Sequence, residues 1–174
     1  MNKNQTIALG GMALSCALAL TACSHNNEGQ VGDPEGSIEV TTSETPAYQP
    51  QDVDTIVAES KWEPVVDTGL NVRWHMQGTV SGNAGGSIIT VEVTNLNDVA
   101  IPQDAIGDPI LTINGGTTVD RLDAEASGVA HQDGLDRPLG PHATTNLRYA
   151  FDVAPGNLYN AEFEIGNVKF EGSL

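Results

Sequence analysis

The fold is decided by residues 70–77, which read Leu-Asn-Val-Arg-Trp-His-Met-Gln. Large apolar side chains alternate strictly with polar ones along this stretch. Because successive side chains of a strand point to opposite faces, the pattern predicts a β-strand with one buried face and makes Trp74 a predicted core residue. The same period returns in residues 89–94 and 146–153, and no stretch shows convincing helical spacing. The sequence therefore predicts an all-β domain.

A predicted hairpin near the C-terminus follows from the spacing of four apolar residues. Phe163 and Ile165 occupy odd positions, whereas Val168 and Phe170 occupy even ones. An unbroken strand would put the two pairs on opposite faces, but a two-residue turn at 166–167, Gly-Asn, puts all four on one face.

A second tight turn is predicted at residues 114–116, Asn-Gly-Gly, between residues 109–113 and 117–122. In total, residues 69–174 contain about seven short predicted strands. This count predicts an immunoglobulin-like antiparallel β-sandwich. The usual disulfide between its sheets is absent, because the two cysteines are Cys16 and Cys23.

The N-terminal 22 residues have the pattern of an export signal. A short, weakly basic start is followed by an apolar run over residues 7–22. The run is broken by glycine and hydroxyl residues and is too short for a typical membrane-spanning helix. We therefore expect residues 1–22 to be a signal peptide.

The apolar run ends in Leu20-Thr21-Ala22-Cys23, which resembles the lipobox of bacterial lipoproteins. The resemblance implies that diacylglycerol is attached to Cys23 and that the chain is cleaved just before it. Two acyl chains give a stable anchor, whereas one gives marginal binding. We therefore expect Cys23 to hold the protein on the extracytoplasmic face of the cell membrane. The alternative is an ordinary secretory leader that happens to contain a cysteine.

The segment between the lipobox and the predicted domain is acidic and poor in apolar residues. Residues 24–54 contain seven acidic residues and no Lys or Arg, so we expect a disordered tether. Residues 55–68 follow neither period, and we interpret them as a lead-in that packs Trp62 on the domain. The predicted boundaries are 1–22 for the signal peptide, 23–54 for the tether, 55–68 for the lead-in and 69–174 for the sandwich.

The charge of the chain bears on its partners. The sequence has 23 acidic and 7 basic residues, with a formal net charge of −16. Phosphate backbones are bound by clustered Lys and Arg, which this sequence lacks, so we do not expect a nucleic-acid partner. Solubility is the simplest explanation of the acidity.

Two groups of residues are weak candidates for metal binding. The first group is a candidate copper site made of histidines, with Met76 as an additional ligand. Its histidines are His75, His131 and His142. The second is a set of acids in and around the long loop 123–143, for calcium; its members are Asp120, Asp123, Glu125, Asp133 and Asp136. No calcium-loop motif is present, and a solvated acidic loop is the preferred interpretation. We expect no metal site and no cofactor.

Ser127, His131 and Asp133 lie close together in the sequence and are candidates for a catalytic triad. A triad is assembled in space on a rigid scaffold, and the Gly-x-Ser-x-Gly elbow is absent. The sequence therefore predicts no catalytic residues and a protein that is not an enzyme.

The stretch 87–155 resembles the immunoglobulin-like accessory domains of Gram-positive lipoproteins and secreted antigens. The resemblance is carried by residues 89–95 (Ile-Thr-Val-Glu-Val-Thr-Asn), 139–141 (Leu-Gly-Pro) and 149–153 (Tyr-Ala-Phe-Asp-Val). It implies an extracytoplasmic β-sandwich, with no activity that belongs to the family as a whole.

These features lead to an expectation for function. We expect a membrane-anchored, non-catalytic binding or protein-interaction module. Its partner would be an envelope protein that approaches the loop 123–143 or an exposed strand edge. The alternative is an extracytoplasmic carrier or sensor of a small ligand or cation. A cavity between the sheets would favour the alternative, and a continuous apolar surface patch would favour the first.

Overall fold

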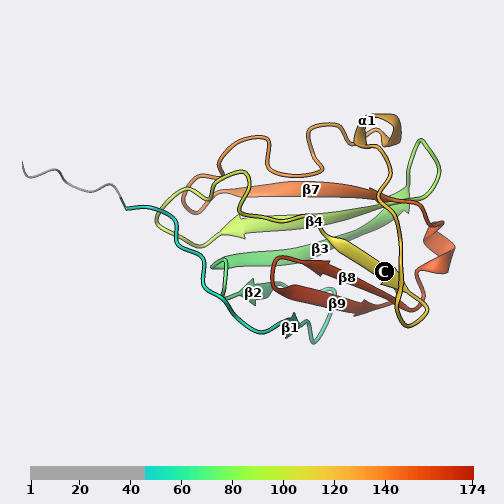
Figure 1. Ribbon diagram of the computed structural model, residues 1–174, viewed down its shortest axis with the longest axis horizontal. Coiled ribbons are helices and arrows are strands. Elements are labelled where there is room, and N and C mark those ends of the chain that lie inside the picture. The colour runs from blue at the N-terminus through green and yellow to red at the C-terminus, as the bar shows by residue number, and fades with distance from the viewer. Residues whose placement is uncertain (1–45) are drawn as a thin grey trace, which may run out of the picture. The chain divides into compact units, whose positions relative to one another are not determined.

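The computed structural model describes residues 46–174, which form two β-sheets packed as a sandwich (Figure 1). One sheet has the order β2-β3-β4-β7, with bounds β2 Val65–Asp67, β3 Val72–Ser81, β4 Ser87–Asn95 and β7 Thr144–Phe151. The other has the order β1-β9-β8-β5-β6, with bounds β1 Ile56–Val57, β9 Val168–Gly172, β8 Ala161–Ile165, β5 Ile110–Ile113 and β6 Thr117–Thr118. Helical structure in the described part consists of α1, Ala124–Ser127, and a 3₁₀ turn, Pro155–Asn157. The predicted all-β sandwich is confirmed.

The strand order matches that of an immunoglobulin domain, which has strands A, B, E and D in one sheet and G, F and C in the other, except that no described strand takes the place of D. Here β3, β4 and β7 take the places of A, B and E, and β9, β8 and β5 take those of G, F and C. β6 extends the second sheet, as strand C′ does in variable-type domains. β2 adds an antiparallel strand to one sheet edge, and β1 adds a parallel strand beside β9. The described residues thus contain nine strands, where about seven were predicted.

The alternation in residues 70–77 produces the inner face of β3. Val72, Trp74 and Met76 are buried, and the residues between them point outward. A β-bulge follows Met76, where the pairing with β4 shifts at Gly78. Because a bulge adds one residue to one strand, the simple alternation ends there.

Aromatic side chains fill the space between the two sheets. Trp74, Tyr149, Phe151, Phe163 and Phe170 are all at most 1% exposed. The Phe151 and Phe163 rings meet edge to face, with centroids 6.2 Å apart. The prediction of Trp74 as a core residue is confirmed, and the core is closed without a disulfide.

Both predicted hairpins are present. In the C-terminal one, Ile165 pairs with Val168 and Phe163 with Phe170 across the turn at 166–167. In the other, β5 and β6 are joined by residues 114–116, all of which have positive φ angles. Glycine tolerates this backbone conformation readily and asparagine tolerates it better than most residues, so the Asn-Gly-Gly sequence suits the turn.

The N-terminal part of the described chain differs from the expectation. Tyr48 and Gln51 lie in the segment assigned to the tether, yet the Tyr48 hydroxyl donates to the Leu70 carbonyl at 3.2 Å and the Gln51 amide to the Gly69 carbonyl at 2.8 Å. The lead-in 55–68 supplies β1 and β2 and so belongs to the sandwich. Sheet edges offer unpaired backbone groups, which explains why a segment without clear periodicity is held there.

Candidate functional site

The predicted lipidation site, Cys23, lies outside the described residues. The same holds for the signal peptide, 1–22, and for the tether up to residue 45. Within residues 46–174, no helix is long and apolar enough to cross a membrane.

Among the described residues, no hydrogen bond or ion pair joins His75, His131 and His142 to one another. His75 lies on the outer face of β3, with Nδ1 4.0 Å from a carboxylate oxygen of Glu92. His142 Nε2 lies 3.1 Å from the exposed carboxylate of Asp98. Met76, the candidate methionine ligand, is buried in the core. The part of the chain that the structure describes contains no group of three or more His, Cys, Asp or Glu side chains placed to hold a metal ion.

Acids of the long loop have structural partners. Asp133 lies 3.5 Å from the Arg121 guanidinium, which also forms a 3.1 Å ion pair with Asp108. Arg121 stacks on the buried Tyr149 ring, with the guanidinium carbon 4.9 Å from the ring centroid. Asp123 caps α1, because its carboxylate accepts a 2.7 Å hydrogen bond from a backbone amide in the first turn. These contacts fasten the loop to β7 and explain two of the five acids without a bound cation.

Within the described residues, no hydrogen bond joins the Ser127 hydroxyl to His131 or to any other base. Ser127 is 1% exposed, and its hydroxyl has no hydrogen-bond partner in the described structure. A nucleophilic serine needs a base that accepts its proton and an opening toward substrate. The arrangement around Ser127 therefore offers no activated nucleophile.

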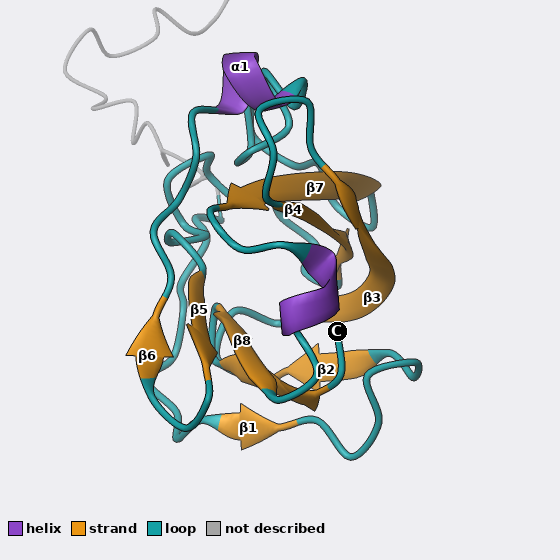
Figure 2. Cartoon of the chain, turned by 90° about the vertical axis from the view of Figure 1, so that its right-hand side faces the viewer, coloured by secondary structure: helices purple, strands orange, loops and turns teal. Residues whose placement is uncertain are grey.

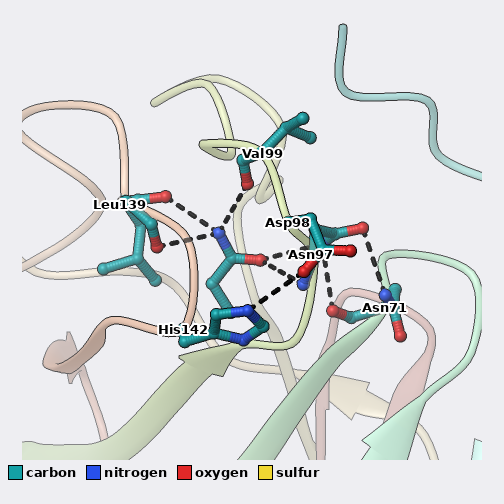
Figure 3. A network of polar contacts seen from close by, with 8 residues as sticks. Asn71, Asn97, Asp98, Val99, Leu139 and His142 are labelled. Carbon is teal, nitrogen blue, oxygen red and sulfur yellow. Dashed lines mark hydrogen bonds and ion pairs between the residues drawn. The ribbon is translucent and has the colours of Figure 1, made fainter. Parts of the chain in front are cut away.

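A network of asparagines joins the loops at one end of the sandwich (Figure 3). The buried Asn95 amide donates to the carbonyls of Val99, Leu139 and Gly140 at 2.9–3.0 Å. Its side-chain oxygen accepts from the backbone and side chain of Asn97 at 2.8 and 2.9 Å. The two amide hydrogens of Asn95 are shared among three loop carbonyls, which gives the Val-Thr-Asn end of β4 a structural role.

The long loop forms a polar groove with the edge of β7. The groove has a volume of about 430 Å³ and runs between residues 131–140 and residues 143–147. At one end the Arg148 amide donates to the Gln132 carbonyl at 2.7 Å, so the loop covers that part of the strand edge. Since pairing alternates along a strand, the backbone groups of Asn146 also point away from β4, into the groove.

A second surface lies where β1 and β2 run along the same edge of the sandwich (Figure 2). A cleft of about 650 Å³ opens between them, lined by residues 56–60 and 63–66. Val57 and Val66 belong to its lining and are 52% and 46% exposed, and Trp62, in the loop between the two lining segments, is 64% exposed. We call the cleft and these three side chains the β1–β2 surface. It gathers half of the large apolar side chains that the described residues expose.

The prediction that Trp62 packs on the domain is wrong. The chain turns outward at Ser60, whose hydroxyl and carbonyl accept hydrogen bonds from the Trp62 and Glu63 amides. The indole then stands in solvent with the Lys61 ammonium 4.8 Å from its ring centroid. Two features of the sequence could have indicated that Trp62 is exposed: it lies between two charged residues, and the stretch around it has neither strand nor helix periodicity.

The chain was compared with family models, curated proteins and solved structures, and none of them matches it.

Proposed function

We propose that this protein is a membrane-anchored surface lipoprotein whose β-sandwich is a non-catalytic protein-interaction module. The β1–β2 surface carries the interaction part of the proposal. Exposed apolar side chains gathered on one surface mark interaction sites, and Val57, Trp62 and Val66 are gathered here. The sandwich core supports a module of this kind, because it is filled by aromatic side chains rather than shaped around a ligand.

The lipobox carries the anchoring part of the proposal. Diacylation of Cys23 would hold the protein at the extracytoplasmic face of the cell membrane, and the acidic residues that follow would separate the sandwich from the lipid headgroups. The resemblance to immunoglobulin-like accessory domains of Gram-positive lipoproteins agrees with this arrangement. The partner we propose is a protein of the same envelope.

Anchoring is tested by labelling cells with a radioactive fatty acid and separating membranes from soluble material. Cys23→Ala should abolish both the labelling of the protein and its recovery in the membrane fraction. The matched control is Cys16→Ala, which removes the other cysteine of the chain and should keep both. Equal labelling of the two variants would contradict the lipidation of Cys23.

The interaction is tested by crosslinking in living cells, affinity capture and mass spectrometry. We expect one envelope protein to be enriched with the wild-type chain and with Cys16→Ala, and to be strongly reduced with Cys23→Ala. Absence of any enriched protein across these three chains would contradict an interaction module.

The groove beside β7 supports a second candidate function, a carrier or sensor of a small polar ligand. Its lining combines backbone groups of the β7 edge with the side chains of His131, Asp136 and Arg137. A ligand that binds the folded state raises the melting temperature by mass action. A thermal-shift screen of amino acids, sugars and cations, repeated with Arg137→Ala, tests this candidate.

A further inference from the structure

The floor and the rim of the β1–β2 surface differ in burial. Ile56, Ala58 and Val65 are half-buried and pack against the core, so they form an apolar floor that the sandwich holds in place. Val57 and Val66 stand at the rim, and Trp62 projects from the loop between the two strands. A cleft with a fixed apolar floor, next to a loop that exposes a tryptophan, suits an apolar side chain of a partner.

The ionisable residues that line the cleft are both acidic. Glu59 and Glu63 are the ionisable residues in its lining, and both are exposed. The nearby Lys61 is directed over the Trp62 ring. The chain as a whole carries −16. A partner segment with Lys or Arg beside its apolar anchor is therefore complementary to this surface, whereas an acidic segment is repelled.

Two other modes of binding fit the geometry less well. β2 has only three residues and follows Pro64, which has no amide hydrogen to donate, so its edge offers little for addition of a strand. An anionic lipid surface would meet the carboxylates of Glu59 and Glu63 and the negative charge of the whole chain. Side-chain recognition of a basic segment remains.

We propose that the β1–β2 surface binds a short segment of the partner protein in which an apolar side chain lies between basic residues. The apolar side chain fills the cleft beside Trp62, and the basic residues pair with Glu59 and Glu63. This inference rests on the proposed function, since it names the chemistry of the partner for that module.

The probe is a short synthetic peptide that alternates Lys and Val, added to the full chain anchored in nanodiscs of phosphatidylcholine. The chain has two tryptophans, and Trp74 is buried whereas Trp62 is exposed, so a change in emission on binding reports Trp62. We expect a saturable blue shift that weakens as salt is raised. A peptide that alternates Glu and Val should produce no shift.

Paired variants locate the binding. Glu59→Gln with Glu63→Gln should weaken binding of the Lys-Val peptide about fivefold, the effect of losing two exposed charge pairs. Asp104→Asn with Asp152→Asn makes the same change in net charge at exposed acids outside both candidate surfaces and should leave the affinity unchanged. Trp62→Ala, followed by calorimetry, should weaken binding at least about tenfold. Unchanged Trp74 emission shows that each variant is folded.

Three results would overturn the inference. The first is equal weakening by the two pairs of acid variants, which would reveal nonspecific attraction to an acidic protein. The second is absence of peptide binding to the wild-type chain. The third is quenching of Trp62 by brominated lipid in the nanodisc, which would show that this surface contacts the bilayer.

The in-cell capture separates failure of this inference from failure of the proposed function. The wild-type chain is compared with two variants, the double variant Glu59→Gln with Glu63→Gln and the single variant Trp62→Ala. If all three capture the envelope protein equally, the interaction module stands and the β1–β2 surface is not its binding site. If capture falls with these variants and not with the double variant Asp104→Asn with Asp152→Asn, the inference is supported in the cell.

Discussion

The Asp67 carboxylate accepts two hydrogen bonds from Asn167, one from its backbone amide and one from its side chain, each 2.9 Å long and spanning 100 residues. Asp67 ends β2 in one sheet, and Asn167 lies in the turn between β8 and β9 of the other. The carboxylate is fully buried and also accepts from the amides of Gly69 and Leu70 and from the Trp74 indole. The Asp67 side chain thus links the end of β2 in one sheet to the β8–β9 turn of the other.

We expect Asp67→Asn to lower the free energy of unfolding by about 2–4 kcal/mol, because the new amide nitrogen cannot accept the bonds that one carboxylate oxygen accepts now. Urea denaturation followed by circular dichroism measures the change. Asp152→Asn removes an exposed carboxylate and should alter stability by less than about 0.5 kcal/mol. Similar midpoints for the two variants would contradict the role assigned to Asp67.

Truncation of the two tryptophans should change the free energy of unfolding by very different amounts. Trp74 is 0% exposed and Trp62 is 64% exposed. Trp74→Ala is expected to cost about 3–5 kcal/mol through lost burial and a cavity in the core. Trp62→Ala should change stability by less than about 0.5 kcal/mol. Thermal or urea unfolding of both variants tests this, and a large loss with Trp62→Ala would show that the indole supports the fold instead of standing free for a partner.

The asparagine network predicts a local effect of Asn95→Asp. The new carboxylate cannot donate to the three carbonyls and places a negative charge among them, so we expect a loss of about 2–4 kcal/mol. Ile101 and Leu139 exchange two 2.9 Å backbone hydrogen bonds beside this network, and their amides should exchange with solvent faster in the variant. Asn146→Asp, at an exposed position on β7, should leave these amides protected.

Sequence patterns predicted those parts of the fold in which neighbours along the chain decide the structure. The alternation around Trp74 and the parity of Phe163 and Phe170 identify buried faces because a strand has a fixed period of two. Glycine and asparagine identify the turns through their tolerance of positive φ. These local rules were sufficient for the strands of both sheets that form the core.

The remaining features depend on residues that are distant in the sequence. Nothing near Asp67 indicates that its donors include Asn167, and nothing near Asn95 indicates that Leu139 and Gly140 supply its acceptors. The exposure of Trp62 follows from the outward turn at Ser60, in a segment without periodicity. Such a segment shows which residues are apolar without showing which of them the sheets cover.

Stability at alkaline pH gives a test of the packing around Tyr149. Burial raises the pKa of this phenol above its ordinary value of 10.0; the Arg121 guanidinium opposes the shift, and Asp108 and Asp133 add to it. The folded state therefore keeps a proton that the unfolded chain releases. The stabilisation is complete below pH 10.0 and is lost as the pH rises from there through the folded-state pKa.

As the pH is raised from neutral to about 11, we expect the urea concentration at the unfolding midpoint to decrease for the wild-type chain. The decrease should be smaller for Tyr149→Phe, which has no phenol to ionise. The matched control, Tyr159→Phe, removes a 67% exposed phenol and should follow the wild-type curve. Both variants keep Lys169, whose pKa is raised by its hydrogen bond to Glu162 and which also loses its stabilising charge at high pH. The difference between the two variants therefore isolates Tyr149, and identical curves would show that its ionisation is not linked to folding.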